Sequence, residues 1–483
     1  MFETLVDRES EAAELRALAD SGRRKLALLY GRRRVGKTYL LTQLWDGERA
    51  FYFTASATSP EINRRVLLEE AGRWSGEELH PEDYPTWRAV FRALFGLHPE
   101  RDLVIVLDEF QYLATGDAGL AEVASELNAV WEGRLPRTGG LLLVLSGSAV
   151  RTLAALANGG SPLYGRLDWV RQLHAFDYYD AGRMLPGYAP ADRIRAYAAF
   201  GGVPKYLSSV DSARPLGQNI VDLLLRPHGE VRLQLETVLA QEEGLREYAT
   251  YQGILQAVGI KRRQRGEIAA ALGREADTPL RRMIAQLVEL GFLEEEKNPG
   301  EPGNQAARYR IADPALRFYY GMVLPNESAI ASAGAATVWT ERLAAQLFPA
   351  YVGREVFEDV VRQAYLRHSR ARGLPAVETW ARWEGRDRDR NPVEIDLVVR
   401  LLDGRMMTGS AKFRERAADA TVLLEHLDAL RRLAASGRAW AREALEPGAP
   451  MLFASAAGFK PSFLEAARDL PSSLVTWTVD DLY

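Results

Sequence analysis

Apolar residues occur along the chain in two patterns, short continuous runs and segments with helical spacing, and these alternate over the first third of the sequence. Continuous apolar runs are typical of strands that are buried on both faces of a parallel sheet. The helically spaced segments between them predict helices that cover those faces, so the alternation predicts a doubly wound α/β sheet. The expected strands are residues 25–30, 50–55, 103–108, 140–145 and 169–176.

The middle of the chain is mostly helical in pattern after Asp177. An amphipathic segment at 193–210 is interrupted by Gly201 and Gly202, which predicts a break between two helices. From about Leu245, three helical segments precede a turn-rich stretch and a strand. Three helices before a hairpin are the order of a winged helix-turn-helix. The helical segments are 248–264, 265–273 and 278–296, the turn-rich stretch is 297–305 and the strand is 307–311.

The last part of the chain begins again with helical spacing and then changes to alternation. The alternating residues 394–399, a turn at Asp403 and Gly404, and a second strand at 405–413 predict a β-hairpin. The fold class is therefore α/β and multidomain. The predicted domains are an α/β core (1–180), a helical segment (181–240), a winged helix-turn-helix (241–325) and a C-terminal α/β domain (326–483).

Composition limits the classes of protein that fit. The hydrophobic fraction of 47% is ordinary for a globular protein, and a formal net charge of −4 requires any nucleic-acid surface to be a local patch. The chain has no cysteine, which excludes disulfides, thiolate zinc sites and cysteine nucleophiles. No stretch approaches the roughly 20 apolar residues that span a bilayer. We therefore expect a cytoplasmic protein without a membrane segment.

Residues 31–38 match the phosphate-loop pattern G-x-x-x-x-G-K-[ST] in full. Glycines let successive backbone N–H groups close around phosphate oxygens, and the following helix directs its positive end at them. Lys37 is expected to reach the β and γ phosphates of ATP, and Thr38 is expected to ligate Mg²⁺. A chance glycine turn would not need the strand before it and the helix after it. The residues expected at the nucleotide are Gly31, Arg34, Val35, Gly36, Lys37, Thr38 and Tyr39.

Two acidic residues end the third apolar run. Asp108 at a strand end can hold Mg²⁺ through water, and Glu109 can act as the base that polarises the attacking water. Acids that merely cap a helix from Phe110 onward would not need to follow a buried strand. Ser148 follows the fourth run. Its hydroxyl either senses the γ-phosphate and orients the water or caps the next helix, and the sequence favours neither.

These motifs resemble the prokaryotic AAA+ and STAND-type P-loop ATPases abundant in archaea, in which the ATPase core precedes a winged helix and a nuclease-like domain. The matching stretches cover most of the chain: "LVDRESEAAEL", "GRRRVGKT", "VLDEFQYL", "LSGSAV", "SPLYGR", "GGVPKYL" and "YRIADPALRFYYGMV". The resemblance implies an ASCE-type core whose opening segment, with Asp7 and Arg8, packs near the adenine.

The same resemblance implies two residues outside the loop. Arg166 of "SPLYGR" would be a phosphate-facing or intersubunit arginine. The intersubunit role requires a homo-oligomer. Pro204 of "GGVP" would contact the nucleotide from a helical lid, the segment 181–240. From the residues alone, Arg166 can equally form a surface salt bridge and Pro204 a loop-to-helix turn.

Three arginines occupy the variable positions of the phosphate loop, where side chains usually point away from phosphate. A solvated cationic rim that attracts anions is the favoured interpretation of Arg32, Arg33 and Arg34. The alternative is contact with a partner subunit or with a nucleic-acid backbone.

The predicted winged helix has a local excess of positive charge. Between residues 261 and 283, basic side chains outnumber acidic ones. Such a helix can enter the major groove of DNA while its flanks neutralise phosphates. Winged helices also dock proteins, so a DNA partner and a protein partner both remain open. The residues expected to contact DNA are Lys261, Arg262, Arg263, Arg281 and Arg282.

The C-terminal segment resembles the core of PD-(D/E)xK nucleases, where acids and a lysine gather around Mg²⁺. The resemblance implies Glu358 as the helix acid, Asp396 as the strand acid and Lys412 as the lysine that positions water. Ser410 stands where a second strand acid is expected, and a hydroxyl is a weak Mg²⁺ ligand. Glu394 shares the strand face of Asp396 and can take the missing place. Ser410 favours a degenerate fold kept for binding or assembly.

Together, these patterns predict an ATPase that binds ATP and Mg²⁺. The preferred function is a switch or motor that couples nucleotide state to DNA binding through the winged helix and the nuclease-like domain. One alternative is a signalling or scaffold ATPase with protein partners, and another is an ATP-gated, Mg²⁺-dependent DNA nuclease. Salt-sensitive DNA binding separates the first from the second, and metal-dependent cleavage separates the third from both.

Overall fold

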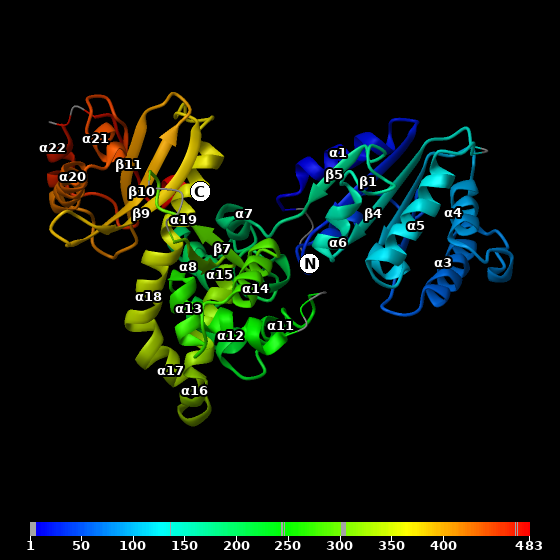
Figure 1. Cartoon of the computed structure of the whole chain (residues 1–483), viewed down its shortest axis with the longest axis horizontal. Coiled ribbons are helices and arrows are strands. Elements are labelled where there is room, and N and C mark those ends of the chain that lie inside the picture. Colours follow the sequence, from blue (N-terminus) through cyan, green and yellow to red (C-terminus); the bar gives the residue numbers. More distant parts are fainter. Residues whose placement is uncertain are drawn as a thin grey trace. The chain divides into compact units, whose positions relative to one another are not determined.

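The computed structural model describes residues 6–135, 137–242, 245, 247–300, 306–468, 470 and 472–483. Contacts along the chain divide it into two compact units, Met1–Ala175 and Phe176–Tyr483. Figure 1 shows the first unit in blue to cyan and the second in green to red. Within the described ranges, no helix is both long enough and apolar enough to cross a membrane.

The first unit is built on a parallel sheet. Within the described part of the unit, the strands are β1 (Arg24–Tyr30), β2 (Ala50–Thr54), β3 (Leu103–Asp108), β4 (Leu141–Gly147) and β5 (Trp169–Gln172). They pair in the order β2-β3-β4-β1-β5, and each pairing is parallel. Every residue of β3 and β4 is buried, which is why these strands are continuous apolar runs in the sequence. The parallel sheet predicted from those runs is confirmed.

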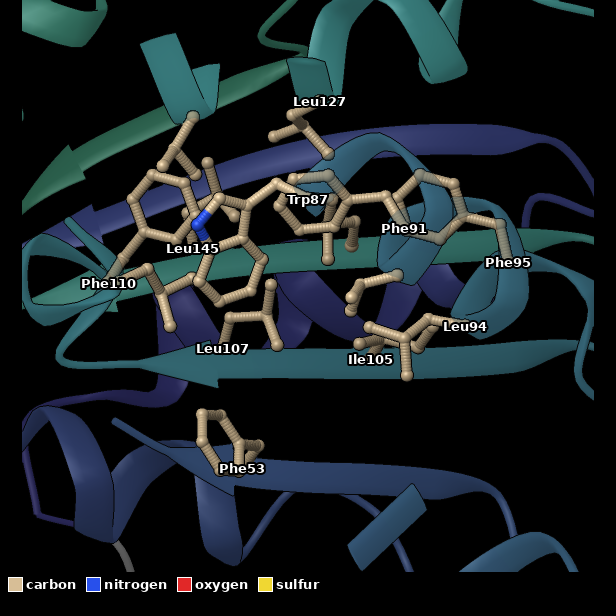
Figure 2. Close-up of a cluster of buried hydrophobic side chains, with 14 of the residues drawn as sticks. Phe53, Trp87, Phe91, Leu94, Phe95, Ile105, Leu107, Phe110, Leu127 and Leu145 are labelled. Atoms are coloured by element: carbon tan, nitrogen blue, oxygen red, sulfur yellow. The ribbon is translucent and has the colours of Figure 1, made fainter. Parts of the chain in front are cut away.

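Helices cover both faces of this sheet. They are α1 (Glu9–Ala19), α2 (Lys37–Thr42), α3 (Pro60–Ser75), η1 (Pro81–Asp83), α4 (Trp87–Gly96), η2 (Phe110–Leu113), α5 (Gly116–Trp131) and α6 (Val150–Leu156). One apolar cluster joins α1 and α2 to the sheet, and another joins α3, α4, α5 and α6 to it. Figure 2 shows the second cluster, in which Trp87, Phe91 and Phe95 of α4 stack in succession.

The strand order fixes where the motifs meet. Strand β4 lies between β1, which leads into the phosphate loop, and β3, which ends at Asp108. This separation of the two motif strands by one strand is the ASCE-type P-loop arrangement predicted above. Because the strands are parallel, their carboxyl ends lie at the same end of the sheet. The phosphate loop, Asp108 and Ser148 therefore lie close together.

The second unit begins with helices. They are α7 (Tyr178–Arg183), α8 (Pro190–Phe200), α9 (Pro204–Leu207), α10 (Leu216–Ile220), η3 (Val221–Leu225) and α11 (Glu230–Glu236). Gly201 after α8 has φ +65°, and a Cβ on Gly202 would lie 1.9 Å from the carbonyl oxygen of Phe176. The predicted break at Gly201 and Gly202 is therefore confirmed, and close packing explains it.

A helical segment with a small sheet follows. Its elements are α12 (Tyr248–Val258), β6 (Arg263–Gln264), α13 (Arg265–Ala271), α14 (Thr278–Glu289), β7 (Leu293–Glu296) and β8 (Arg308–Ile311). The strands pair antiparallel in the order β6-β8-β7. A helix, a short strand, two helices and a hairpin are the element order of a winged helix-turn-helix. Residues 301–305 of the predicted turn-rich stretch lie outside the described residues.

More helices connect this segment to the C-terminal sheet. They are α15 (Pro314–Phe318), η4 (Tyr319–Val323), η5 (Leu324–Asn326), α16 (Glu327–Ala333), α17 (Ala335–Val338), η6 (Trp339–Leu347), α18 (Phe348–Tyr351) and η7 (Val352–Val356). The Tyr351 hydroxyl donates to the carbonyl oxygens of Ala198 (3.1 Å) and Pro314 (3.0 Å). Helices before and after the small sheet thus pack together. The domain boundaries proposed from the sequence stay predictions.

The C-terminal sheet is mixed. Its strands are β9 (Val377–Arg386), β10 (Pro392–Leu401), β11 (Met406–Lys412), β12 (Met451–Ser455) and β13 (Leu474–Trp477), and its helices are α19 (Phe357–His368), α20 (Ala420–Ala435), α21 (Ala439–Glu443), α22 (Pro461–Arg468) and η8 (Asp480–Leu482). Strands β9, β10 and β11 pair antiparallel, whereas β11, β12 and β13 pair parallel. The hairpin predicted around Asp403 and Gly404 is confirmed as β10–β11.

Candidate functional site

The backbone of the phosphate loop depends on glycine at both ends. Gly36, just before α2, has φ +96°, in the left-handed region that favours glycine. At the other end, a Cβ on Gly31 would lie 2.3 Å from the carbonyl oxygen of Leu173. Arg34 between them also has a left-handed φ of +70°. A side chain at Gly31 would therefore force the loop away from the chain after β5.

Lys37 is held against its own loop. Its ammonium group donates to the carbonyl oxygens of Gly31 (2.7 Å) and Arg32 (3.1 Å). The residue is only 5% exposed, and a buried ammonium group needs such polar partners. This is the place from which a phosphate-loop lysine reaches phosphate oxygens.

Thr38 and Asp108, the two residues predicted to hold Mg²⁺ near the loop, are in contact. The Thr38 hydroxyl donates to Oδ2 of Asp108 at 2.7 Å. The hydroxyl of Tyr52 on β2 donates to the same oxygen. Burial and the charge of Asp108 raise the pKa of Tyr52 above its ordinary value, so this phenol stays a donor. A hydroxyl in the first turn of α2 and a carboxylate at the end of β3 fit the oxygen ligands that Mg²⁺ prefers.

Glu109 lies at a sharp turn and accepts several hydrogen bonds. Its φ is +52°, and its Oε2 accepts from the Ser148 hydroxyl (2.7 Å) and the Ser148 backbone N–H (3.3 Å). The Gln111 amide donates to the same oxygen. The N-cap of α6 is Ala149, without a side-chain hydrogen bond. Ser148 therefore contacts Glu109 and does not cap α6, and the sensing of the γ-phosphate by its hydroxyl stays a prediction.

Arg8 links the opening segment to the phosphate loop. Its guanidinium group donates to the carbonyl oxygens of His174 (2.6 Å) and Val35 (3.4 Å) and pairs with Asp7 at 3.1 Å. Burial and the charge of Arg8 lower the pKa of His174. Arg8 thus braces the loop after β1 against the chain after β5. The adenine contact expected of Asp7 and Arg8 stays a prediction.

One loop arginine does not lie on a solvated rim. Nη2 of Arg33 donates to the Tyr112 hydroxyl at 2.6 Å, and its Nε donates to the Ser148 hydroxyl at 3.4 Å. For Arg33 the rim interpretation is therefore wrong, because strand order brings η2 and the end of β4 beside the loop.

Arg166 lies near the amino ends of the strands, at the end of the sheet opposite to the phosphate loop. It precedes β5 and pairs with Glu132 after α5, at 2.9 Å with both side chains well exposed. Because β5 runs parallel to β1 from the pair Ala27 and Trp169 onward, residues before β5 lie toward the amino ends of the strands. The phosphate loop follows the carboxyl end of β1. Phosphate contact within the same chain is therefore wrong for Arg166, and an intersubunit role stays a prediction.

Three other predicted nucleotide contacts differ in their surroundings. Val35 is buried in the cluster with α1, whereas Tyr39 on α2 is 42% exposed. Pro204 is the first residue of α9 in the second unit. Contact of Val35, Tyr39 and Pro204 with nucleotide stays a prediction.

Arg262 is not available to DNA. Its guanidinium group pairs with Glu296 (2.8 Å), Glu355 and Glu358 (3.8 Å), and its side chain is 7% exposed. The prediction that Arg262 contacts DNA is therefore wrong, because acids from β7, η7 and α19 surround it.

The other predicted DNA contacts are more accessible. Arg263 is half-buried, and its Nε is buried. Lys261 is exposed before β6, and Arg281 and Arg282 are exposed on α14. The buried face of α14 is formed by Leu280, Met283, Ile284 and Leu287. Helical spacing thus leaves both arginines on the solvent side.

The C-terminal sheet gathers three carboxylates. Ligand atoms of Glu358, Glu394 and Asp396 lie within 4.8 Å of one another. Glu358 and Asp396 are buried, and Glu394 is exposed. Glu394 thus lies where the sequence suggested that it replaces the acid missing at Ser410. The set offers oxygen ligands alone, which fits a hard cation such as Mg²⁺.

Asp396 and Lys412 form a close pair inside this cluster. Oδ2 of Asp396 accepts from Lys412 Nζ (2.8 Å), the Ser410 hydroxyl (2.7 Å) and the Ala411 N–H (3.0 Å). Burial raises the pKa of Asp396, but the charge of Lys412 and these donors outweigh it and lower the pKa below its ordinary value. Asp396 therefore stays ionised, and Ser410 orients it instead of supplying a charge.

Arg382 contacts the other two acids of the cluster. Arg382 on β9 contacts Glu394 and approaches Glu358 at 3.4 Å. Burial raises the pKa of Glu358 well above its ordinary value, and this outweighs the opposing charge of Arg382. A cation bound to these oxygens would compete with the guanidinium group. The ligand atoms are of the type that Mg²⁺ prefers, but the guanidinium group of Arg382 contacts two of the three acids.

Sequence reasoning missed Tyr52, Gln111 and Arg382. Tyr52 lies near the end of β2, which pairs with β3, so its contact with Asp108 could be inferred from strand order alone. Gln111 is two residues after Glu109, but its side chain reaches back to Glu109 only because η2 forms a 3₁₀ turn. Arg382 could not be identified, because nothing in the sequence shows that β9 pairs with β10.

Residues 5–210 match the family model of an ATPase domain found predominantly in Archaea. An uncharacterized protein of Methanocaldococcus jannaschii is 26% identical over 329 residues, which cover 67% of this chain and 70% of that protein. Among solved structures, a Walker-type ATPase of Pyrococcus abyssi has a TM-score of 0.47 at 22% identity, over 65% of this chain and 96% of that chain. The ORC2 protein of Aeropyrum pernix has a TM-score of 0.44 at 16% identity, over 68% of this chain and 96% of that chain.

Proposed function

We propose that this chain, whose residues 5–210 form an archaeal-type P-loop ATPase domain, is a switch or motor that couples ATP binding and hydrolysis to DNA binding. The observation that supports DNA binding is the exposure of Arg281 and Arg282 on α14, within a winged-helix order of elements. The observation that supports the hydrolytic half is the meeting of Lys37, Thr38, Asp108 and Glu109 at one edge of the sheet.

In the proposed reaction, Lys37 binds phosphate oxygens and offsets the negative charge that develops on the transferred phosphoryl group. Thr38 and Asp108 would hold Mg²⁺, which when bound stabilises charge on the phosphate oxygens. Glu109 accepts the proton of the attacking water. Ser148 holds the carboxylate of Glu109 in place through its 2.7 Å hydrogen bond.

DNA binding would use α14 as the recognition helix. Arg281 and Arg282 are exposed on this helix, and Lys261 is exposed on the approach to it. Guanidinium and ammonium groups in such positions neutralise backbone phosphates and release counterions. Arg262 supports the surface from inside, because its ion pairs with Glu296 and Glu355 fix the strand edge next to Lys261.

Removing the exposed cations should weaken duplex binding and its dependence on salt. Alanine at Lys261, Arg281 and Arg282 together is expected to lower affinity about tenfold or more and to reduce the salt slope by about one unit per lost phosphate contact. The measurement is duplex affinity by fluorescence anisotropy over a range of salt concentrations. A matched control removes the same charge from other exposed positions of the second unit: Lys460, Arg226 and Arg342. Binding that is absent or salt-independent in the unaltered protein would favour a protein partner.

A second candidate function is Mg²⁺-dependent cleavage of DNA by the C-terminal site. The observation in its favour is the approach of three carboxylates within 4.8 Å, with Lys412 at 2.8 Å from Asp396. In this function, Lys412 would position the attacking water, and the carboxylates would hold the cation that stabilises the phosphorane charge.

If this site cleaves DNA, cleavage should require Mg²⁺ and should be lost, by at least about 100-fold, in both Asp396→Ala and Lys412→Ala. The assay follows nicking of plasmid DNA with Mg²⁺ and with a chelator. Asp428→Ala, an exposed acid on α20, is the control for an acid-to-alanine change. Cleavage that survives both changes would come from elsewhere, and no cleavage at all would leave a binding or assembly role.

A further inference from the structure

We infer that Arg33 is a positioning residue for ATP hydrolysis, through which the phosphate loop sets the orientation of Glu109. The inference goes beyond the proposed site residues, and it rests on the proposed role of Glu109 as the base. It is carried by a chain of hydrogen bonds that begins in the loop and ends on the glutamate.

The direction of this chain follows from the chemistry of its members. A guanidinium group only donates and a carboxylate only accepts, so the hydroxyl between them must accept from Arg33 and donate to Glu109. The distances are 3.4 Å from Arg33 Nε to Ser148 Oγ and 2.7 Å from Ser148 Oγ to Glu109 Oε2. Each bond of such a chain polarises the next, which strengthens the hold on the carboxylate.

Gln111 completes the coordination of the hydroxyl. Its amide donates to Ser148 Oγ at 3.3 Å, so the two lone pairs of that oxygen accept from Arg33 and Gln111 while its proton goes to Glu109. Gln111 is 6% exposed. Gly147 leaves room for its side chain, because a Cβ at that position would lie 2.2 Å from Gln111 Oε1. The Ser148 hydroxyl therefore has a full set of partners and one orientation.

A second contact ties Arg33 to the turn that carries Glu109. Nη2 of Arg33 donates to the Tyr112 hydroxyl at 2.6 Å. The buried amide of Asn63 donates to the Tyr112 carbonyl oxygen at 2.7 Å, so the turn is held from a second side as well. Because Arg33 belongs to the loop that would enclose phosphate, a shift of the loop moves the donor that orients Ser148 and Glu109.

The test compares Arg33→Ala, Ser148→Ala and the double variant in steady-state ATP hydrolysis. Arg33→Ala should lower kcat about tenfold while KM for ATP changes by less than about threefold, the split expected of a group that acts on the chemical step. In the Ser148→Ala background, the same change should cost less than about threefold, because both residues act along one route. Arg33→Lys should not restore the rate, since an ammonium group cannot span Ser148 and Tyr112 as a planar fork does.

Three results would overturn the inference. One is full additivity of the two changes, the second is a raised KM with unchanged kcat, and the third is rescue of kcat by Arg33→Lys. Arg33→Gln, which keeps the length and one amide donor, replaces the alanine variant if that variant does not fold. Arg65→Ala on α3 controls for loss of a cation elsewhere in the unit. Glu109→Gln, measured alongside, separates the outcomes: if it keeps full activity, the proposed base is wrong, whereas if it is inactive, only Arg33 is in question.

Discussion

Glu109→Gln is expected to lower kcat for ATP hydrolysis about 100-fold or more, while affinity for ATP changes by less than about threefold. Glutamine keeps the shape of the side chain and an oxygen that can accept from Ser148, so the turn after β3 should persist. It cannot take the proton of the attacking water. Phosphate release under saturating ATP gives kcat, and equilibrium binding of a fluorescent ATP analogue gives the affinity.

The matched control for this change is Glu122→Gln, an exposed glutamate on α5 that touches none of the loop residues described above. It should leave both kcat and affinity unchanged. Hydrolysis at the full rate in Glu109→Gln would mean that another group activates the water. Loss of ATP binding in the same variant would mean that Glu109 has a structural role in the loop.

Arg310→Met is expected to destabilise the second unit by about 3–5 kcal/mol, the usual cost of removing one partner of a buried ion pair. Arg310 on β8 is nearly inaccessible and pairs with Glu294 (2.6 Å), Glu296 (2.7 Å) and Asp359 (2.8 Å). Methionine fills the space but leaves the carboxylate of Asp359 without its main partner. Urea-induced unfolding followed by tryptophan fluorescence measures the change in free energy of unfolding.

The pH dependence of this change has a defined sign. Burial raises the pKa of Asp359, but Arg310 and Arg317 outweigh it and lower the pKa below its ordinary value. The stability from this pair is therefore present above the ordinary carboxyl pKa of about 4 and is lost as pH falls below it. The difference between Arg310→Met and the unaltered protein should shrink toward low pH.

Arg308→Met is the control for the stability experiment. Arg308 lies two residues earlier on the same strand, but its guanidinium group is 4.0 Å from the carboxylate of Glu384 and both side chains are more exposed. We expect a loss of about 1 kcal/mol or less. Equal losses in the two variants would show that the network around Arg310 adds nothing beyond an ordinary partly exposed ion pair.

The ATPase half of the molecule could be predicted from sequence because its signals are local. Strands β3 and β4 and the middle of β1 are buried on both faces and therefore form continuous apolar runs, and the phosphate loop is a contiguous motif between β1 and α2. Parallel pairing then places strand ends at one edge, which brings Thr38 to Asp108 and Ser148 to Glu109. These meetings follow from strand order without any knowledge of side-chain packing.

The errors have a different origin, since they concern side chains whose partners are far away in the sequence. Arg262 lies in a basic stretch, but Glu355 and Glu358, which bury it, come from η7 and α19 nearly a hundred positions later. The loop motif predicts a solvated Arg33, because the motif does not include Tyr112 on η2, to which Arg33 donates a hydrogen bond. Charge counted along the chain could not reveal either pairing, because each depends on how separate elements pack.

The C-terminal site lies between these two cases. The hairpin is a local signal, and the period of two along β10 correctly placed Glu394 on the same face as Asp396. The contact of Arg382 with two of these acids depends on the pairing of β9 with β10, which the sequence did not indicate. The three acids could thus be predicted to meet, but the guanidinium group that contacts two of them could not.

In the proposed switch, the nucleotide bound at the phosphate loop would set the affinity for DNA. The most direct measurement is the dissociation constant of a duplex for the Glu109→Gln variant with saturating ATP, with ADP and without nucleotide, at fixed salt. We expect the duplex affinity with ATP and with ADP to differ about tenfold or more, a coupling free energy of about 1.4 kcal/mol. Lys37→Ala should abolish the difference. Equal duplex affinity in all nucleotide states, or a difference that persists in Lys37→Ala, would rule out the proposed coupling.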